Sequence, residues 1–242
     1  MIVESRVIRQ GHLGVELWHV LMLPHGHGPW PAVLLIHEYT GLNSVILGHA
    51  QRLVEAGYAV LAADFYGVEN RPENIDQART IHRLYRNDRL LMRNRAQACL
   101  QALVEQPDID PQAVFALGLS FGGGAVLELA RTGADLKGAV SIYGYLDTTH
   151  HSLTEDIKAP LLVLFVEDDP VVPAEHARQF EDEMSGAGVR YEFIRIENAR
   201  HGFANPEDAG FDEALAEWMW ESVMEWMRPE KDYDGLSPLK RV

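Results

Sequence analysis

The sequence predicts an α/β protein whose mainly parallel sheet is covered by helices on both faces. Short, continuous apolar runs are typical of strands buried on both faces, and such runs occupy residues 31–38, 58–65, 113–118, 137–144 and 159–166. Amphipathic helical segments lie between several of these runs, as expected of right-handed βαβ units. The chain has 242 residues, of which 47% are hydrophobic, so it can bury one large core. We therefore expect a single domain over residues 1–242.

The elements are expected in the following order along the chain. Residues 3–24 mix alternating and apolar stretches around Gly11 and Gly14, which predicts an antiparallel hairpin at one edge of the sheet. A helix over 43–56 has Asn43 and Ser44 as candidate N-caps and ends at Gly57. Further helices are expected over 96–104 and 211–227, and one more strand over 191–196. The tail from 229 onward is polar with little periodicity, which indicates either a frayed end or a strap across the surface.

Composition narrows the possible partners of this chain. The net charge of −15 disfavours binding to nucleic acid or to anionic membranes, so we expect a small-molecule ligand. The single cysteine, Cys99, cannot form an internal disulfide, and its helical spacing predicts an inert core thiol. No signal-peptide pattern and no long apolar run is present, so we expect a cytoplasmic protein. His25 and His27 lack a carboxylate at suitable spacing, so no metal site is expected there.

A serine lies between glycines where a predicted strand turns directly into a predicted helix. Gly118, Ser120 and Gly122 form the pattern G-x-S-x-G, with a buried strand before it and a helix after it. Such a turn lifts the serine oxygen above the sheet at the positive end of a helix, where a developing negative charge is stabilised. The alternative is that these small residues only let the helix pack closely on the strand.

A serine nucleophile needs a base and a carboxylate, and both types follow at the ends of later strands. Glu167, Asp168 and Asp169 lie in one loop after the run 159–166, and we favour Asp169 because Pro170 fixes the exit of the loop. His201 follows the strand expected over 191–196. The chain order serine, aspartate, histidine is the one expected of this type of fold.

Five short segments together carry a resemblance to a known family: HEYTG (37–41), ADFYG (63–67), GLSFGG (118–123), DPVVP (169–173) and HGF (201–203). In their order and spacing the chain resembles the dienelactone hydrolase family of α/β-hydrolases over nearly its whole length. The resemblance implies an α/β-hydrolase fold and hydrolysis of an ester or lactone through a covalent acyl-enzyme, without a metal or organic cofactor. It implies a nucleophile, an acid and a base at Ser120, Asp169 and His201, an active-site glutamate at Glu38, and oxyanion-binding backbone N–H groups at Tyr39 and Phe121.

Two positions depart from this family's pattern. The best-known members have a cysteine nucleophile, whereas this chain has Ser120, as other members of the broad family do. Members that bind the dienelactone carboxylate have an arginine shortly after the histidine, and Asn205 stands at that position here. The resemblance therefore implies an ester or lactone hydrolase without implying the dienelactone itself as substrate.

An arginine-rich segment could supply a substrate-binding cation instead. Seven arginines lie between residues 71 and 95, and Arg79 and Arg83 share one helical face, which makes them candidates for binding a carboxylate. The alternative is a solvated face that pairs with Glu73, Asp76 and Asp88. Other candidates for the wall of the site follow the run 137–144; they are Tyr145, His150 and His151.

The sequence thus favours a serine hydrolase of small esters, lactones or thioesters. A peptidase or an acyltransferase remains an alternative, because the same acyl-enzyme can form from an amide or pass to another acceptor. A binding protein that keeps the hydrolase fold without catalysis is the alternative from a different class.

Overall fold

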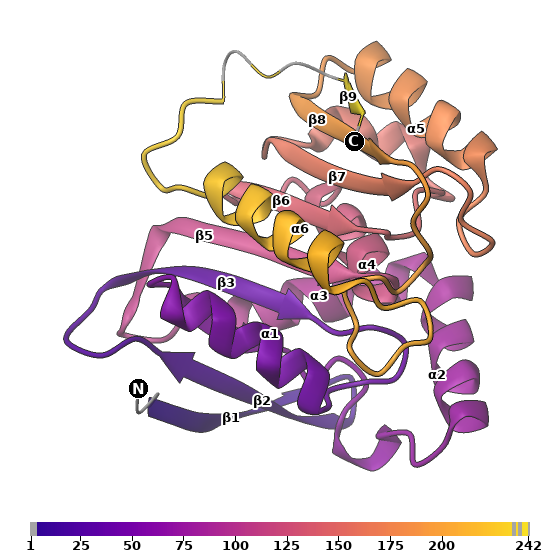
Figure 1. Cartoon of the computed structure of the whole chain (residues 1–242). Helices are drawn as coiled ribbons and strands as arrows, with labels where there is room; N and C mark the ends of the chain where they lie inside the picture. Colours follow the sequence, from indigo (N-terminus) through magenta and orange to yellow (C-terminus); the bar gives the residue numbers. More distant parts are fainter. Residues whose placement is uncertain (1–3, 234–235, 237–238, 242) are drawn as a thin grey trace.

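The computed structural model describes residues 4–233, 236 and 239–241, and it places one twisted sheet at the centre of the molecule (Figure 1). Within these residues the sheet has nine strands in the order β1-β2-β4-β3-β5-β6-β7-β8-β9. The strands are β1 Glu4–His12, β2 Val15–Leu23, β3 Trp30–Ile36, β4 Ala59–Ala62, β5 Ile109–Leu119, β6 Gly138–Ile142, β7 Leu161–Val166, β8 Tyr191–Ile196 and β9 Leu239–Arg241.

Helices cover both faces of this sheet (Figure 1). They are α1 Ser44–Glu55, α2 Ile75–Asn87, α3 Arg89–Val104, α4 Phe121–Ala130, α5 Ala174–Gly186 and α6 Glu213–Trp226, with short 3-10 helices at Val68–Asn70 and His151–Asp156. Apolar residues of α1 and α6 pack in one buried cluster on one face of the sheet. Those of α3, α4 and α5 pack in a second cluster on the other face. Each layer therefore has its own core.

The pairing of the strands confirms the predicted fold class. From β3 and β4 through to β9 all neighbours are parallel, whereas β1 and β2 form an antiparallel hairpin with Glu4 opposite Leu23. The hairpin extends one edge of the sheet, because β2 also pairs in antiparallel fashion with β4. The carboxyl ends of the parallel strands consequently meet at one edge of the sheet, which is where open α/β sheets bind their ligands.

The helix expected over 96–104 is longer than the sequence predicted, and the helical face expected for Arg79 and Arg83 lies on α2. The helix expected over 96–104 begins at Arg89, and a separate helix, α2, precedes it. Asp88 ends α2 and caps α3, since its Oδ1 accepts a hydrogen bond from the Leu91 N–H at 2.9 Å. Arg93 and Arg95 on α3 are buried. Because charged residues are normally counted as exposed, the buried positions of α3 do not form a recognisable apolar pattern in the sequence.

The described part of the tail has contacts that a frayed end would lack, and the alternative of a surface strap stays a prediction. Its described part packs on the body of the protein: the Tyr233 ring lies 4.8 Å from that of Trp226, and its hydroxyl donates to the Trp226 carbonyl at 2.9 Å. Further on, β9 extends the sheet beside β8. Residues 234–235, 237–238 and 242 of the predicted tail lie outside the described residues. Among the helices that are described, none combines the length and apolar character needed to cross a membrane.

Candidate active site

The serine turn joins β5 to α4 in a strained backbone conformation. Ser120 has φ 51° and ψ −113°, a region that residues with a side chain rarely adopt. A Cβ atom on Gly122 would lie 2.1 Å from the Ile36 carbonyl oxygen, and one on Gly118 would lie 2.2 Å from the backbone of Gly122. Close packing of the helix on the strands therefore accounts for both glycines. It does not account for the strain at Ser120, which is typical of a functional residue.

Three side chains from the ends of three different strands meet above this turn. The Ser120 Oγ lies 2.8 Å from the His201 Nε2, and the His201 Nδ1 lies 2.6 Å from the Asp169 Oδ2. Ser120 follows β5, Asp169 follows β7 and His201 follows β8. This is the geometry in which a histidine can accept the serine proton while the carboxylate orients its ring.

Asp169 is the member of its acidic loop that contacts the histidine. Its side chain is fully buried, and its second oxygen accepts a hydrogen bond from the Val171 N–H at 2.7 Å. Asp168 is exposed to solvent. Glu167 instead pairs with Arg195 on β8, with 3.1 Å between the charged atoms. Proximity to the histidine thus distinguishes Asp169 from both neighbouring carboxylates.

Glu38 lies buried beside this site, and no arginine in the described part of the chain pairs with it. Its Oε1 accepts a hydrogen bond from the Tyr143 hydroxyl at 3.1 Å, and its Oε2 accepts one from the Asn205 side-chain amide. Burial raises the pKa of the Glu38 carboxyl, and the hydrogen bonds from Asn205 and Tyr143 offset part of that effect. Asn205 therefore fixes Glu38 through a neutral donor.

Tyr143 is a residue of the site that sequence reasoning missed. It is a non-glycine residue at φ 37°, and its ring lies edge-on at 5.1 Å from the His201 ring and 5.2 Å from the Phe203 ring. Burial raises the pKa of its phenol well above the ordinary value, so the hydroxyl stays protonated and donates to Glu38. The sequence feature that could have identified Tyr143 is its position near the carboxyl end of the run 137–144. In the structure β6 ends at Ile142, so Tyr143 is the first residue after the strand.

Two backbone segments are the expected donors to an oxyanion. Phe121 is the first residue of α4, and the first N–H groups of a helix have no acceptor within the helix. Tyr39 lies in a turn closed by the bond from the Gly41 N–H to the Glu38 carbonyl at 3.1 Å. The Tyr66 hydroxyl donates to the Tyr39 carbonyl at 3.0 Å and holds that peptide in place. The expectation that Tyr39 and Phe121 donate to an oxyanion remains a prediction.

Comparison with known proteins assigns this arrangement to a family. Residues 18–231 match the model of the dienelactone hydrolase family. The chain belongs to the dienelactone hydrolase family. It is therefore a hydrolase, and the predicted resemblance is confirmed.

Individual members show how far the similarity extends. A Synechocystis protein named "Putative carboxymethylenebutenolidase" is 25% identical, over 94% of this chain and 98% of its own length. The crystal structure of a dienelactone hydrolase-like promiscuous phosphotriesterase from metagenomic libraries is 29% identical, with a TM-score of 0.87 over 93% of this chain and 97% of that chain. An acylaminoacyl peptidase of Pyrococcus horikoshii shares the fold at 13% identity, with a TM-score of 0.75 over 97% of this chain and 43% of that chain.

The arginines proposed as substrate ligands in this dienelactone hydrolase family member lie on the outside of α2. Arg79 is exposed and pairs with Asp76 at 3.6 Å, and Arg83 is also exposed. The pairing of Arg79 agrees with the alternative of a solvated face. Among the other arginines, Arg71 pairs with Asp64, Arg86 and Arg89 pair with Asp147, and Arg93 pairs with Glu128. Arg95 instead donates to the His12 Nδ1 at 2.9 Å and to the Phe65 carbonyl at 2.7 Å.

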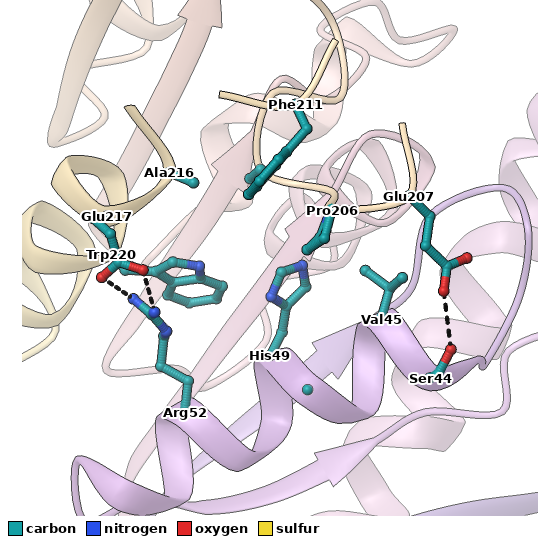
Figure 2. A pocket seen from close by; sticks show the side chains of 12 residues that line it. Ser44, Val45, His49, Arg52, Pro206, Glu207, Phe211, Ala216, Glu217 and Trp220 are labelled. Carbon is teal, nitrogen blue, oxygen red and sulfur yellow. Dashed lines mark hydrogen bonds and ion pairs between the residues drawn. The ribbon is translucent and has the colours of Figure 1, made fainter. Parts of the chain in front are cut away.

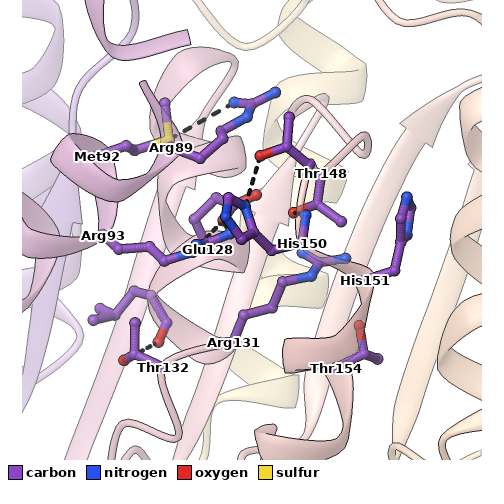
Figure 3. A network of polar contacts seen from close by, with 12 residues as sticks. Arg89, Met92, Arg93, Glu128, Arg131, Thr132, Thr148, His150, His151 and Thr154 are labelled. Atoms are coloured by element: carbon purple, nitrogen blue, oxygen red, sulfur yellow. Dashed lines mark hydrogen bonds and ion pairs between the residues drawn. The ribbon is translucent and has the colours of Figure 1, made fainter. Parts of the chain in front are cut away.

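Three further wall candidates follow β6, and they lie in different surroundings. Tyr145 is half-buried, and the Arg86 guanidinium lies 3.7 Å from its ring centroid. His150 is exposed and bonded to Thr149, while His151 is exposed and lies 3.2 Å from Glu183 on α5. His150 thus bonds to a neighbouring exposed threonine, whereas His151 contacts a glutamate that is mostly buried. Figure 3 shows both histidines in one view with Arg93 and Glu128, whose pair links α3 to α4.

Two other sequence expectations concern metal binding and the cysteine. No group of three or more histidine, cysteine, aspartate or glutamate side chains suited to a metal ion occurs in the described part of the chain. Cys99 is fully buried on α3, and burial raises the pKa of its thiol to about 12. A thiol in that environment stays protonated and is a poor nucleophile.

Proposed function

We propose that this protein is a serine hydrolase that cleaves small esters, lactones or thioesters through an acyl-enzyme. The observation that carries the proposal is the chain of contacts from the Ser120 Oγ to the His201 Nε2 at 2.8 Å and from the His201 Nδ1 to the Asp169 Oδ2 at 2.6 Å. A protein that used these residues only for packing would need neither this series of hydrogen bonds nor the strained backbone of Ser120.

The reaction begins when the Ser120 Oγ attacks the substrate carbonyl and His201 Nε2 takes the hydroxyl proton. The buried Asp169 carboxylate stabilises the resulting imidazolium and keeps the ring in the correct tautomer. The N–H groups of Phe121 and Tyr39 donate to the oxyanion that forms on the carbonyl oxygen. The tetrahedral intermediate collapses, His201 returns its proton to the leaving oxygen or sulfur, and the acyl group remains on Ser120.

Water completes the cycle by the reverse route. His201 takes a proton from the water as its oxygen attacks the acyl carbon. The second tetrahedral intermediate then releases the carboxylic acid, and the proton returns to the Ser120 oxygen. The balance requires only ester and water. The residues of the site therefore need no co-reactant.

Glu38 has a positioning role in this scheme. A carboxylate near the oxyanion opposes the developing charge, so its presence needs a reason. Its hydrogen bonds from Tyr143 and Asn205 connect β3 to the segments after β6 and β8. Glu38 begins the turn that presents the Tyr39 N–H, so fixing its side chain fixes that donor.

The class of substrate follows from the charges at the site. Asn205 is neutral and bound to Glu38, and Arg79 is exposed and paired with Asp76. Neither residue therefore supplies a free positive charge that would select substrates with a carboxylate. The name of the Synechocystis relative supports lactones as substrates. The net charge of −15 supports a small-molecule substrate without a nucleic-acid partner, and a location in the cytoplasm belongs to the same proposal.

A substrate panel tests the proposal. We expect the wild-type protein to hydrolyse p-nitrophenyl acetate and small neutral lactones, and Ser120→Ala to lower kcat by several orders of magnitude with unchanged Tm. Amide and phosphotriester probes belong in the same panel, because relatives of this fold bear those names. Preferred cleavage of the amide would favour a peptidase. Hydrolysis that survives in Ser120→Ala would contradict the proposed nucleophile.

A further inference from the structure

A groove separate from the serine site lies between α1 and α6. It has a volume of about 370 Å³ and is closed on a third side by the loop that follows β8. Figure 2 shows His49 rising from α1 into the space between Trp220 of α6 and Pro206 of the loop, with Phe211 above. An apolar cavity of about 150 Å³ holds one benzene molecule, so this groove can hold one or two rings.

The walls of the groove are mainly apolar. Trp220 and Val45 are almost completely buried, whereas Phe211 is 39% exposed. Ala216 and Pro206 complete this surface. An aromatic ring placed in the groove would cover the exposed surface of Phe211, which is a favourable use of aromatic surface.

One polar side chain is buried in this apolar surface. His49 is only 7% exposed, its ring lies 5.1 Å from that of Trp220, and its Nε2 has no hydrogen-bond partner among the described residues. Burial and the neighbouring Arg52 lower the pKa of His49 to about 4, so the ring is neutral near pH 7. A buried polar group without a partner is costly, and a small shift of the His49 ring toward the groove would let a ligand hydroxyl donate to or accept from its Nε2.

The charged side chains at the rim of the groove do not favour a charged ligand. Arg52 forms a two-pronged pair with Glu217, in which Nη1 lies 2.8 Å from one carboxylate oxygen. Glu207 is exposed and accepts a hydrogen bond from the Ser44 hydroxyl at 3.3 Å. Because the Arg52 guanidinium is already paired with Glu217, it would bind an anionic ligand only weakly, and the Glu207 carboxylate would repel such a ligand. Glu207 is solvated and would bind a cationic ligand only weakly.

The sequence also leaves the groove open at the middle of α1. Gly48 lines it, and a Cβ atom added there would meet nothing within 4 Å. Glycine inside a helix is unfavourable relative to residues with a side chain. At this position its effect is to keep free the space that a larger side chain would fill.

From these observations we propose that the α1–α6 groove is a second binding site, which takes a small neutral aromatic molecule bearing one hydroxyl group. The ring occupies the space over Gly48 between Trp220 and Phe211, and the hydroxyl hydrogen-bonds to the His49 imidazole. The proposal does not depend on the reaction at Ser120, because binding is measured without turnover.

Fluorine NMR titration of the full-length protein tests this site with 4-fluorophenol as the probe. We expect binding with a Kd on the order of 1 mM, at least tenfold tighter than for 4-fluorobenzoate or 4-fluorobenzylamine. Gly48→Leu fills the groove and should weaken phenol binding at least tenfold without lowering Tm. Gly186→Leu is the matched control, because Gly186 is another helical glycine with open space at its Cβ position, on α5.

A second variant tests the hydrogen bond to the ring nitrogen. In the wild type, 4-fluorophenol should bind more tightly than fluorobenzene, and in His49→Phe this preference should disappear while fluorobenzene still binds. Undiminished phenol binding in Gly48→Leu would place the probe elsewhere and overturn the proposal. Equal or tighter binding of either charged probe, or an unchanged preference for phenol in His49→Phe, would overturn the assigned ligand class.

Discussion

Replacing Asp169 by asparagine should disable the site by reversing the tautomer of its histidine. In the native site the Asp169 Oδ2 lies 2.6 Å from the His201 Nδ1, so the ring carries its hydrogen there and leaves Nε2 free to accept from Ser120. Asparagine keeps the shape of the side chain and an oxygen for the Val171 N–H. Its NH2 group then faces Nδ1 and favours the tautomer with the hydrogen on Nε2.

The expected loss is large because that tautomer cannot take the serine proton. A triad aspartate changed to asparagine lowers kcat by ~10⁴-fold, or about 5.4 kcal/mol of transition-state stabilisation. Hydrolysis of p-nitrophenyl acetate measures kcat, and Tm reports whether the fold persists. Asp168→Asn is the matched control, since Asp168 is exposed in the same loop. A loss below ~10-fold for Asp169→Asn, or a larger loss for Asp168→Asn, would refute this reasoning.

Three further predictions concern the carboxylates and buried charges. Glu38→Gln should lower kcat/KM of ester hydrolysis by less than Asp169→Asn does, because Glu38 positions a turn and does not hold the imidazolium; the reverse ranking would make Glu38 the main carboxylate. Glu128→Gln should lower the free energy of unfolding in urea by about 3 kcal/mol, because Arg93, whose Nε lies 2.7 Å from Glu128, would stay buried and unpaired; an effect under ~0.5 kcal/mol would contradict this. Burial lowers the pKa of His37 to about 4, so below its unfolded value of about 6.5 the unfolded chain binds a proton that the folded chain does not, and stability should fall between pH 6.5 and 4. Urea unfolding at a series of pH values measures this fall, and a flat profile would contradict it.

The parts of the site that could be predicted are those written locally in the sequence. Gly118, Ser120 and Gly122 are close neighbours in the chain, so one short pattern contains the turn and its steric reason. Asp169 and His201 could be placed because each follows a buried strand, and parallel strands bring their carboxyl ends to one edge. The fold class was predictable for the same reason.

The contacts that sequence reasoning missed join residues far apart in the chain. Asn205 was noted only as the place where an arginine is missing, whereas it binds Glu38 across 167 positions. Tyr143 reaches the same carboxylate across 105 positions. No periodicity or spacing encodes such pairs, because they depend on how three loops pack above the sheet.

The arginine-rich segment shows the same limit at the level of an element. The sequence suggested that these arginines either bind substrate or pair with nearby carboxylates, and Arg79 does pair with a nearby carboxylate, that of Asp76. Arg86 and Arg89 instead hold Asp147 in the loop after β6. Buried arginines with distant partners interrupt the apolar pattern of a helix, and for this reason the start of α3 was placed seven residues too late.

The central claim is that Ser120 is the nucleophile of a covalent acyl-enzyme. Intact mass spectrometry after treatment with a fluorophosphonate tests it most directly, because the reagent labels a serine only where a base and an oxyanion site activate it. We predict one adduct per chain, located at Ser120 by peptide mapping and absent in Ser120→Ala. An adduct at another residue, or ester hydrolysis that continues with Ser120 unlabelled, would contradict the account.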